Sequence, residues 1–171
     1  MDSKYSKNQM PILRPVPIPT KGAGFFMAIY LWLATNRKWE LMEDWKFELR
    51  KGVWIVIHTG FIFDGASIPR LLWWILAPTG ILLIPGLVHD YAYRFGYLRM
   101  TYKDKVEFKY GIFMSRNYWD DMFKVIGIKV NGMKILNNLA YYSLVLFGWV
   151  AWNKHLKIRG RNTEKVMHVN V

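Results

Sequence analysis

The stretch 82–96 reads LLIPGLVHDYAYRFG. In a helix, side chains four positions apart lie on one face. A helix over about Leu82–Gly96 therefore places His89 and Tyr93 in one row and Asp90 in the neighbouring row. This arrangement gives a base, a phenol and a carboxylate a common location, which is typical of a functional site.

His89 is the candidate catalytic base. A neutral imidazole takes a proton from water near neutral pH when another group holds its second ring nitrogen. Two acids for this role, Glu107 and, in a shifted register, Asp104, follow on a segment expected to be a helix, about Tyr102–Tyr118. We therefore predict a hydrogen-bonded His89–Glu107 pair between two packed antiparallel helices. The alternative is structural, with His89 and Asp90 satisfying each other.

An Asp-Gly turn precedes the His89 helix. The strand-like run Val53–Phe63 ends at Asp64, and Ser67 follows shortly before a proline. One interpretation is helix capping, because both side chains can accept hydrogen bonds from free helix amides. The other is that the turn packs against the start of the helix and brings Asp64 and Ser67 to the same cavity as Asp90.

Three spaced motifs resemble a known family. They are G-F-x-x-D-x-A-S-x-P-R at residues 60–70, H-D-Y-x-Y-R at residues 89–94 and V-E-x-x-Y-x-x-x-M at residues 106–114. Together they resemble a phage and prophage family catalogued as domain of unknown function 1353, over about residues 53–152. The resemblance implies a bacteriophage origin and, by itself, no activity.

The order H-D-x-x-Y-R is also similar to the catalytic helix of secreted phospholipases A2. The similarity implies that His89 activates water, Asp90 binds calcium and Glu107 orients the histidine. It implies no cofactor other than calcium. The chain departs from those enzymes because it lacks their glycine-rich calcium loop and their cysteines.

Composition narrows the class of protein. The chain has 171 residues, enough for one domain with a sizeable core, and 17% of them are aromatic. It has no cysteine, which excludes disulfides and thiolate zinc sites. It also lacks a phosphate-binding loop, a dinucleotide fingerprint and the G-x-S-x-G context of a serine nucleophile.

The two ends suggest the domain organisation. Residues 1–21 are polar and proline-rich and predict an extended basic arm, residues 22–153 a single globular domain, and residues 154–171 a basic tail. The formal net charge is +12, and positive residues gather in the arm and the tail. These ends favour contacts with anionic lipid or nucleic acid, or with other phage proteins in an assembly. A solubilising surface is the alternative.

Two apolar runs raise the question of a membrane. Leu71–Val88 and Ile135–Asn153 carry no charge and approach the length of about 20 residues that a membrane-spanning helix needs. Proline and glycine interrupt the first run, and Asn137 and Asn138 make the start of the second polar. We expect both to be buried or to face an interface, and a holin-like membrane protein stays open as an alternative.

The overall expectation is an α+β fold, mainly helical, with a small antiparallel sheet at the front followed by packed helices. Strands are expected over about Lys38–Leu49 and Val53–Phe63, a helix or strand over Phe25–Ala34, and a last helix over Lys134–Trp152.

For function, we expect a phage component that is made in the host cytoplasm and then joins the tail or particle of the virion. It would keep a phospholipase-like arrangement of histidine and acid, with or without activity. The alternative is an active calcium-dependent lipid ester hydrolase that acts on the host envelope.

Overall fold

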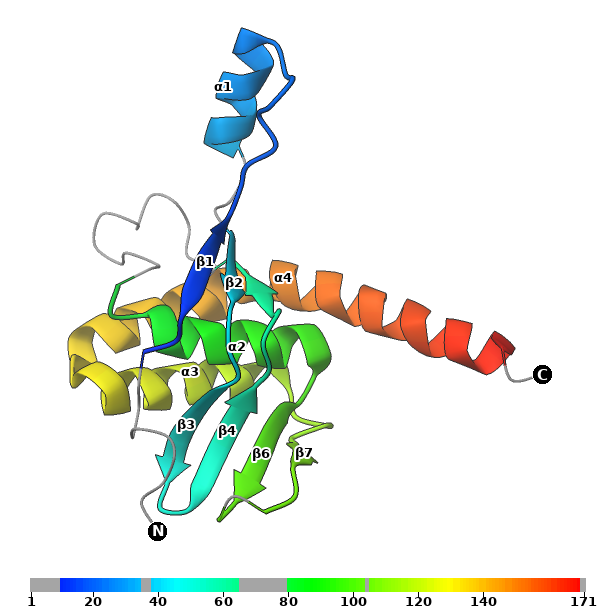
Figure 1. Cartoon of the computed structure of the whole chain (residues 1–171). Coiled ribbons are helices and arrows are strands. Elements are labelled where there is room, and N and C mark those ends of the chain that lie inside the picture. The colour runs from blue at the N-terminus through cyan, green and yellow to red at the C-terminus, as the bar shows by residue number, and fades with distance from the viewer. Residues whose placement is uncertain (1–9, 35–37, 65–79, 104, 170–171) are drawn as a thin grey trace.

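The computed structural model describes residues 10–34, 38–64, 80–103 and 105–169 (Figure 1). Within these residues the fold is α+β, as expected, with two small antiparallel sheets and four helices. Two of the candidate site residues, Ser67 and Asp104, lie outside the described residues.

The strands form two separate sheets. The first has the order β1-β2-β5 and consists of β1 (Leu13–Val16), β2 (Lys38–Leu41) and β5 (Ile62–Phe63). The second has the order β3-β4-β6-β7 and consists of β3 (Trp45–Arg50), β4 (Val53–Ile57), β6 (Leu98–Tyr102) and β7 (Phe108–Tyr110). All pairs are antiparallel. The chain passes from the first sheet to the second between β2 and β3, and back between β4 and β5 (Figure 1).

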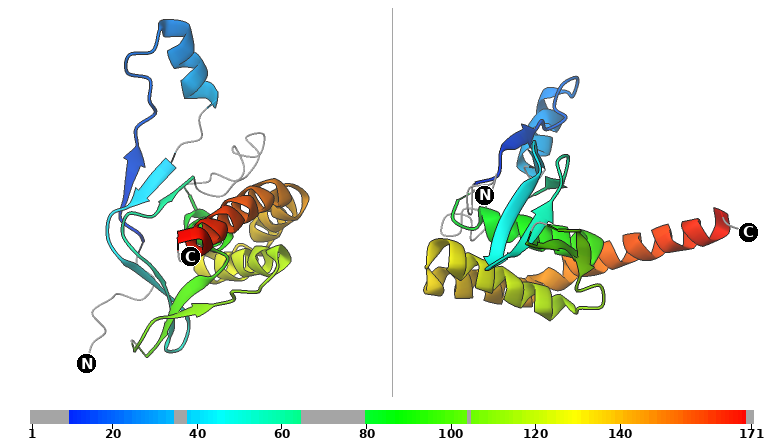
Figure 2. Two further views of the ribbon diagram at one scale, coloured as in Figure 1. Left: turned by 90° about the vertical axis from the view of Figure 1, so that its right-hand side faces the viewer. Right: turned by 60° about the horizontal axis from the view of Figure 1, so that its bottom comes forward.

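Three helices pack together, α2 (Leu83–Phe95), α3 (Arg116–Asn131) and α4 (Lys134–Val169), and they lie side by side (Figure 2). Helices α2 and α3 contact the second sheet, whereas α4 packs against α2 and α3. The end of α3 meets the start of α2, because the Asn131 side chain donates to the carbonyl of Ile81. The two helices are therefore antiparallel. The short helix α1 (Phe25–Ala34) projects away from this body (Figure 1).

The core lies between the second sheet and α2. Phe47 pairs with Ile55, and Ile55 pairs with Met100, so these three buried side chains form one row across the sheet. From the helix side, Leu87 and Val88 are buried in the same cluster. Full burial of each such side chain stabilises the fold by about 1.5–3 kcal/mol, and this row therefore fixes where α2 sits on the sheet.

Four expectations about the elements are wrong. The segment Tyr102–Tyr118 is not one helix, because it contains the end of β6, strand β7 and only the start of α3. Gly111, which follows β7, has φ +79°, a conformation that favours glycine and ends a regular element. The segments Lys38–Leu49 and Val53–Phe63 each contain two strands that belong to different sheets, and the last helix continues past Trp152 to Val169.

Candidate functional site

A buried hydrogen-bond network joins α2 to α3. His89 Nε2 lies 2.9 Å from Oδ1 of Asp120, and the Tyr93 hydroxyl donates to the same oxygen over 2.5 Å. The side chains of His89 and Asp120 are 2% and 0% exposed. His89 and Tyr93 are four residues apart on α2, so the predicted helical row is real, and it faces a carboxylate on α3.

The surroundings of the network hold its groups in place. The His89 ring contacts the ring of Tyr93 at 3.9 Å between centroids and meets Phe123 edge to face at 5.6 Å. Burial raises the pKa of Tyr93, and the hydrogen bond to Asp120 raises it further. The phenol therefore stays protonated and acts as a donor to the carboxylate.

Arg116 supplies positive charge to the buried carboxylate. Its Nε lies 4.0 Å from Oδ2 of Asp120, one helical turn away, and within the described part of the chain that oxygen has no hydrogen-bond partner. The guanidinium also donates to the carbonyls of Leu144 and Val145 on α4. A buried anion is costly unless it is compensated, so Arg116 both offsets the charge of Asp120 and ties α4 to α3.

The acid that holds His89 is therefore Asp120, and the predicted pairing with Glu107 is wrong. Glu107 lies near the start of β7, where its Oε2 is 3.1 Å from Nε2 of His58 and 3.6 Å from Arg99. His58 Nδ1 also bonds to Asp44. These side chains form a second, partly exposed cluster at the end of the sheet, separate from the His89 network.

Asp120 leaves a weak signal in the sequence. It is part of the buried stripe of α3 that includes Trp119, Phe123 and Ile126. An acid within an apolar stripe needs a buried partner, so the position of Asp120 within this stripe is the signal that identifies it as a site residue. The neighbouring Asp121 is more than half exposed, so the sequence alone gives two adjacent candidates, and the helical phase decides between them.

Asp64 and Asp90 share a cavity, as expected for two motifs that serve one site, but Asp64 lies beside the second half of α2 and not at its start. Both line a polar cavity of about 170 Å³ between the end of β5, α2 and α4. Burial raises the pKa of Asp90 well above its ordinary value, and the charge of Asp64 raises it further, whereas Arg94 lowers it. Part of Asp90 is still accessible, but its Oδ2 is buried and has no hydrogen-bond partner among the described residues.

Tyr93 connects the cavity to the network. It lines the cavity together with Asp64 and Asp90, and its hydroxyl reaches Asp120. Lys154 and His155 of α4 close the far side of the cavity. Burial lowers the pKa of His155, and the nearby cations Arg94 and Lys154 lower it further, so this imidazole stays neutral at physiological pH.

Helix α4 approaches this region closely because of a glycine and an arginine. A Cβ on Gly148 would lie 2.9 Å from the Tyr93 hydroxyl, so only glycine allows the present distance. Further along α4, Arg159 Nη1 donates to the carbonyl of Tyr93 over 2.6 Å. The second half of α4, expected to be a basic tail, thus contributes a direct contact to α2.

Comparison with known proteins gives one match. A family model described as "Protein of unknown function (DUF1353)" matches residues 39–144. This range contains Asp64, Asp90, His89, Tyr93 and Asp120. No curated protein and no solved structure matches the chain.

Proposed function

The chain belongs to the DUF1353 family of proteins of unknown function, and we propose that it is a phage-encoded, calcium-dependent lipid ester hydrolase. The observation that supports this proposal is the 2.9 Å contact between His89 Nε2 and Asp120. An imidazole held by a carboxylate through one nitrogen is oriented to act as a general base through the other.

The proposed reaction begins with water. Donation from Nε2–H to Asp120 leaves Nδ1 of His89 unprotonated, so Nδ1 takes a proton from water as the water oxygen attacks the ester carbonyl. Asp120 stabilises the resulting imidazolium, and the hydrogen bond from Tyr93 holds the carboxylate in place. The imidazolium then returns the proton to the leaving alkoxide, which yields a fatty acid and an alcohol.

The pair Asp64 and Asp90 fits a hard cation. Calcium prefers carboxylate and carbonyl oxygens, and the buried Oδ2 of Asp90 has no protein partner among the described residues. The described part of the chain contains no group of three or more His, Cys, Asp or Glu side chains that could hold a metal ion. Carbonyl groups or water would therefore complete the coordination. When bound, calcium supplies charge that stabilises an oxyanion.

Two apolar surfaces are suited to contact the lipid. On α1, Phe25, Phe26 and Tyr30 are exposed, with Phe26 at 85%. On α4, Leu146, Trp149 and Val150 are more than half exposed, and cations follow at Lys154 and Lys157. Apolar and aromatic residues followed by cations favour an anionic bilayer surface.

Helix α4 also bears on the holin-like alternative. Among the described residues, Lys134–Gly160 is long and apolar enough to cross a membrane. However, Ala140 and Leu144 on this helix are buried with Phe123 of α3 and Leu82. A helix with one face in a protein core and the opposite face apolar favours binding along the bilayer surface over crossing it.

The second candidate function is a non-catalytic component of the virion. The burial of His89 favours it, because a sealed His–Asp–Tyr network also serves simply to lock two helices together. In that case the apolar and basic surfaces would contact other phage proteins, and the protein would be found at fixed stoichiometry in purified particles.

Hydrolysis of phosphatidylglycerol vesicles, with calcium or with a chelator, separates the two candidates. We expect wild type to release fatty acid only with calcium, and His89→Gln to lose about 10²-fold or more of the rate. His58→Gln is the matched control, because that histidine lies in the separate cluster at the end of the sheet. Equal rates in the two variants would contradict the proposal.

A further inference from the structure

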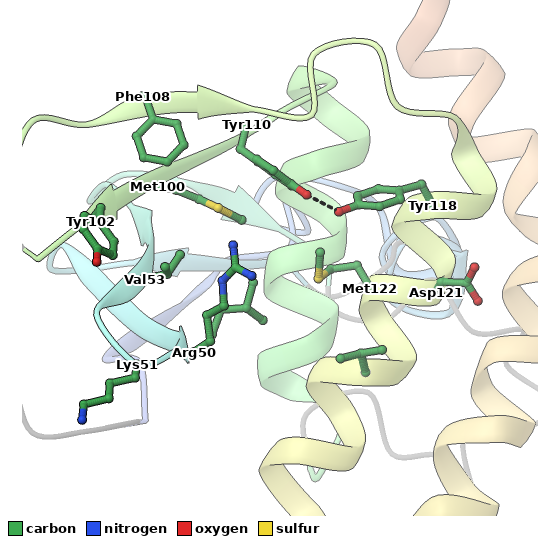
Figure 3. Close-up of a pocket in the computed structure, with 12 residues that line it drawn as sticks. Arg50, Lys51, Val53, Met100, Tyr102, Phe108, Tyr110, Tyr118, Asp121 and Met122 are labelled. Carbon is green, nitrogen blue, oxygen red and sulfur yellow. Dashed lines mark hydrogen bonds between the residues drawn. The ribbon is translucent and has the colours of Figure 1, made fainter.

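A second cavity lies at the opposite end of the sheet from the aspartate pair. It has a volume of about 760 Å³ and lies between the second sheet and α3. Its apolar wall includes Met100 and Phe108 from the sheet and Met122 and Val125 from α3 (Figure 3). Phe108 and Val125 are about half exposed, so the cavity is a groove that solvent reaches.

The charge in this groove is positive. Figure 3 shows the side chain of Arg50 pointing into it, with Lys51 at its edge. Among the described residues, no carboxylate lies within salt-bridge distance of either cation. The acid at the edge, Asp121, has its own partner in Lys124 at 3.5 Å.

The polar groups of the wall satisfy each other. The hydroxyls of Tyr110 and Tyr118 are hydrogen-bonded at 2.6 Å (Figure 3). Burial raises the pKa of Tyr118 to about 12, helped by the bond to Tyr110, so neither hydroxyl needs a ligand and the wall carries no negative charge near neutral pH. The group that has no oppositely charged partner among the described residues is the guanidinium of Arg50.

We propose that this groove binds a long-chain fatty acid, with the carboxylate on Arg50 and the acyl chain along the apolar wall. The cavity volume lies within the range of small-molecule pockets, about 300–1,000 Å³. A guanidinium matches a carboxylate through two parallel hydrogen bonds. The remaining walls offer methyl, thioether and ring surfaces, which suit an unbranched chain.

The groove is separate from the His89 network, so this binding does not depend on hydrolysis. The test is a fluorescence titration with cis-parinaric acid, a fluorescent fatty acid, below its micelle concentration. We expect saturable binding of one molecule per chain. Palmitate should displace it, whereas methyl palmitate, which has no charge, should not.

Two variants remove the proposed contacts. Arg50→Gln removes the charge, and Val125→Glu places an anion in the groove at an exposed position. Each should weaken binding about tenfold or more, Arg50→Gln because the charge-assisted hydrogen bond is lost and Val125→Glu because its anion lies against the apolar chain and repels the carboxylate. Lys134→Gln, at an exposed cation at the start of α4, is the control and should bind nearly as wild type does.

Several results would overturn the inference. They are absence of saturable binding in wild type, equal binding by all variants, and displacement by methyl palmitate as strong as by palmitate. A wild-type dimer in sedimentation that Val125→Glu dissociates would show that a second copy covers the groove instead. His89→Gln should bind cis-parinaric acid normally, so loss of hydrolysis and loss of this site are distinguishable.

Discussion

The hydroxyl of Tyr93 donates a 2.5 Å hydrogen bond to the same carboxylate oxygen of Asp120 that His89 contacts. Two residues one turn apart on α2 thus converge on a single atom of α3. One oxygen receives both donors, and this fixes the rotation of α2 relative to α3 as well as the orientation of the imidazole.

Tyr93→Phe tests this relationship. The substitution removes one donor from a fully buried carboxylate, so we expect the free energy of unfolding to fall by about 1–3 kcal/mol and the hydrolysis rate to fall as the imidazole loses its fixed partner. Urea denaturation measures the first effect. Tyr142→Phe, at an exposed tyrosine of α4, is the control, and an equal loss in both variants would mean that the bond contributes nothing specific.

Gly148→Ala tests the close approach of α4 to the network. A Cβ there would lie 2.9 Å from the Tyr93 hydroxyl, so either the helix or the tyrosine must shift, and we expect a lower melting temperature. Gly160→Ala is the matched control on the same helix, since a Cβ at that position meets no atom within 4 Å. This control should gain about 0.5–1 kcal/mol from helix propensity. A stabilising Gly148→Ala would contradict the packing.

Asp90→Asn tests the carboxylate pair. Asp90 has a pKa well above its usual value because of burial and the charge of Asp64. A raised pKa contributes stability below the unfolded value, about 3.9, and that contribution is lost as pH rises through the folded value. At neutral pH without calcium, the variant should therefore be more stable than wild type, by about 0.5–2 kcal/mol.

With added calcium, wild type should instead be more stable than Asp90→Asn. Wild type should gain stability with added calcium through binding to the folded state, and Asp90→Asn should not. Thermal unfolding with calcium and with chelator measures both effects, and Asp121→Asn, at an exposed acid outside this cavity, is the control. If calcium does not change the thermal stability of wild type, Asp64 and Asp90 do not form a metal site.

His58 provides a pH-dependent contribution to stability. Partial burial lowers its pKa, but the bonds to Asp44 and Glu107 outweigh this and raise it above the ordinary value. The stabilising effect is therefore complete below about pH 6.5 and is lost as pH rises through the folded pKa.

The His58 cluster is partly exposed, so the difference between wild type and His58→Gln should be small, about 0.2–1 kcal/mol. It should be present near pH 6 and absent near pH 9. Denaturant unfolding at the two pH values measures it, and a difference that grows with pH would show that the sign is wrong.

The sequence predicts much of the fold because its strongest signals are local. Helix α2 runs over Leu83–Phe95 and ends at Gly96 with φ +76°, as the pattern over residues 82–96 indicates. The segment after Tyr102 is misassigned because Val106, Tyr110 and Met114 are four residues apart and so fit a helix, whereas Phe108 and Tyr110 pair across the sheet with Met100 and Leu98. Pairing with a distant strand decides such cases, and local sequence does not record it.

For the candidate site as well, the sequence predicts what depends on one helix and misses what depends on packing between elements. The helical row of His89 and Tyr93 depends on spacing within one helix and is correctly predicted. The partner acid comes from another element, so its identity depends on the order in which helices pack. Glu107 is nearer in sequence, but it lies at the start of a strand and contacts His58, whereas Asp120 faces α2 and contacts His89.

The most direct test of the account is the rate of lipid ester hydrolysis by four proteins: wild type, His89→Gln, Asp120→Asn and the double variant. Residues that act as one catalytic unit are not additive. We therefore predict a loss of about 10²-fold or more for His89→Gln, and no further loss when Asp120→Asn is added. Calcium-dependent activity that survives in His89→Gln, or no activity in wild type at any calcium concentration, would contradict the account.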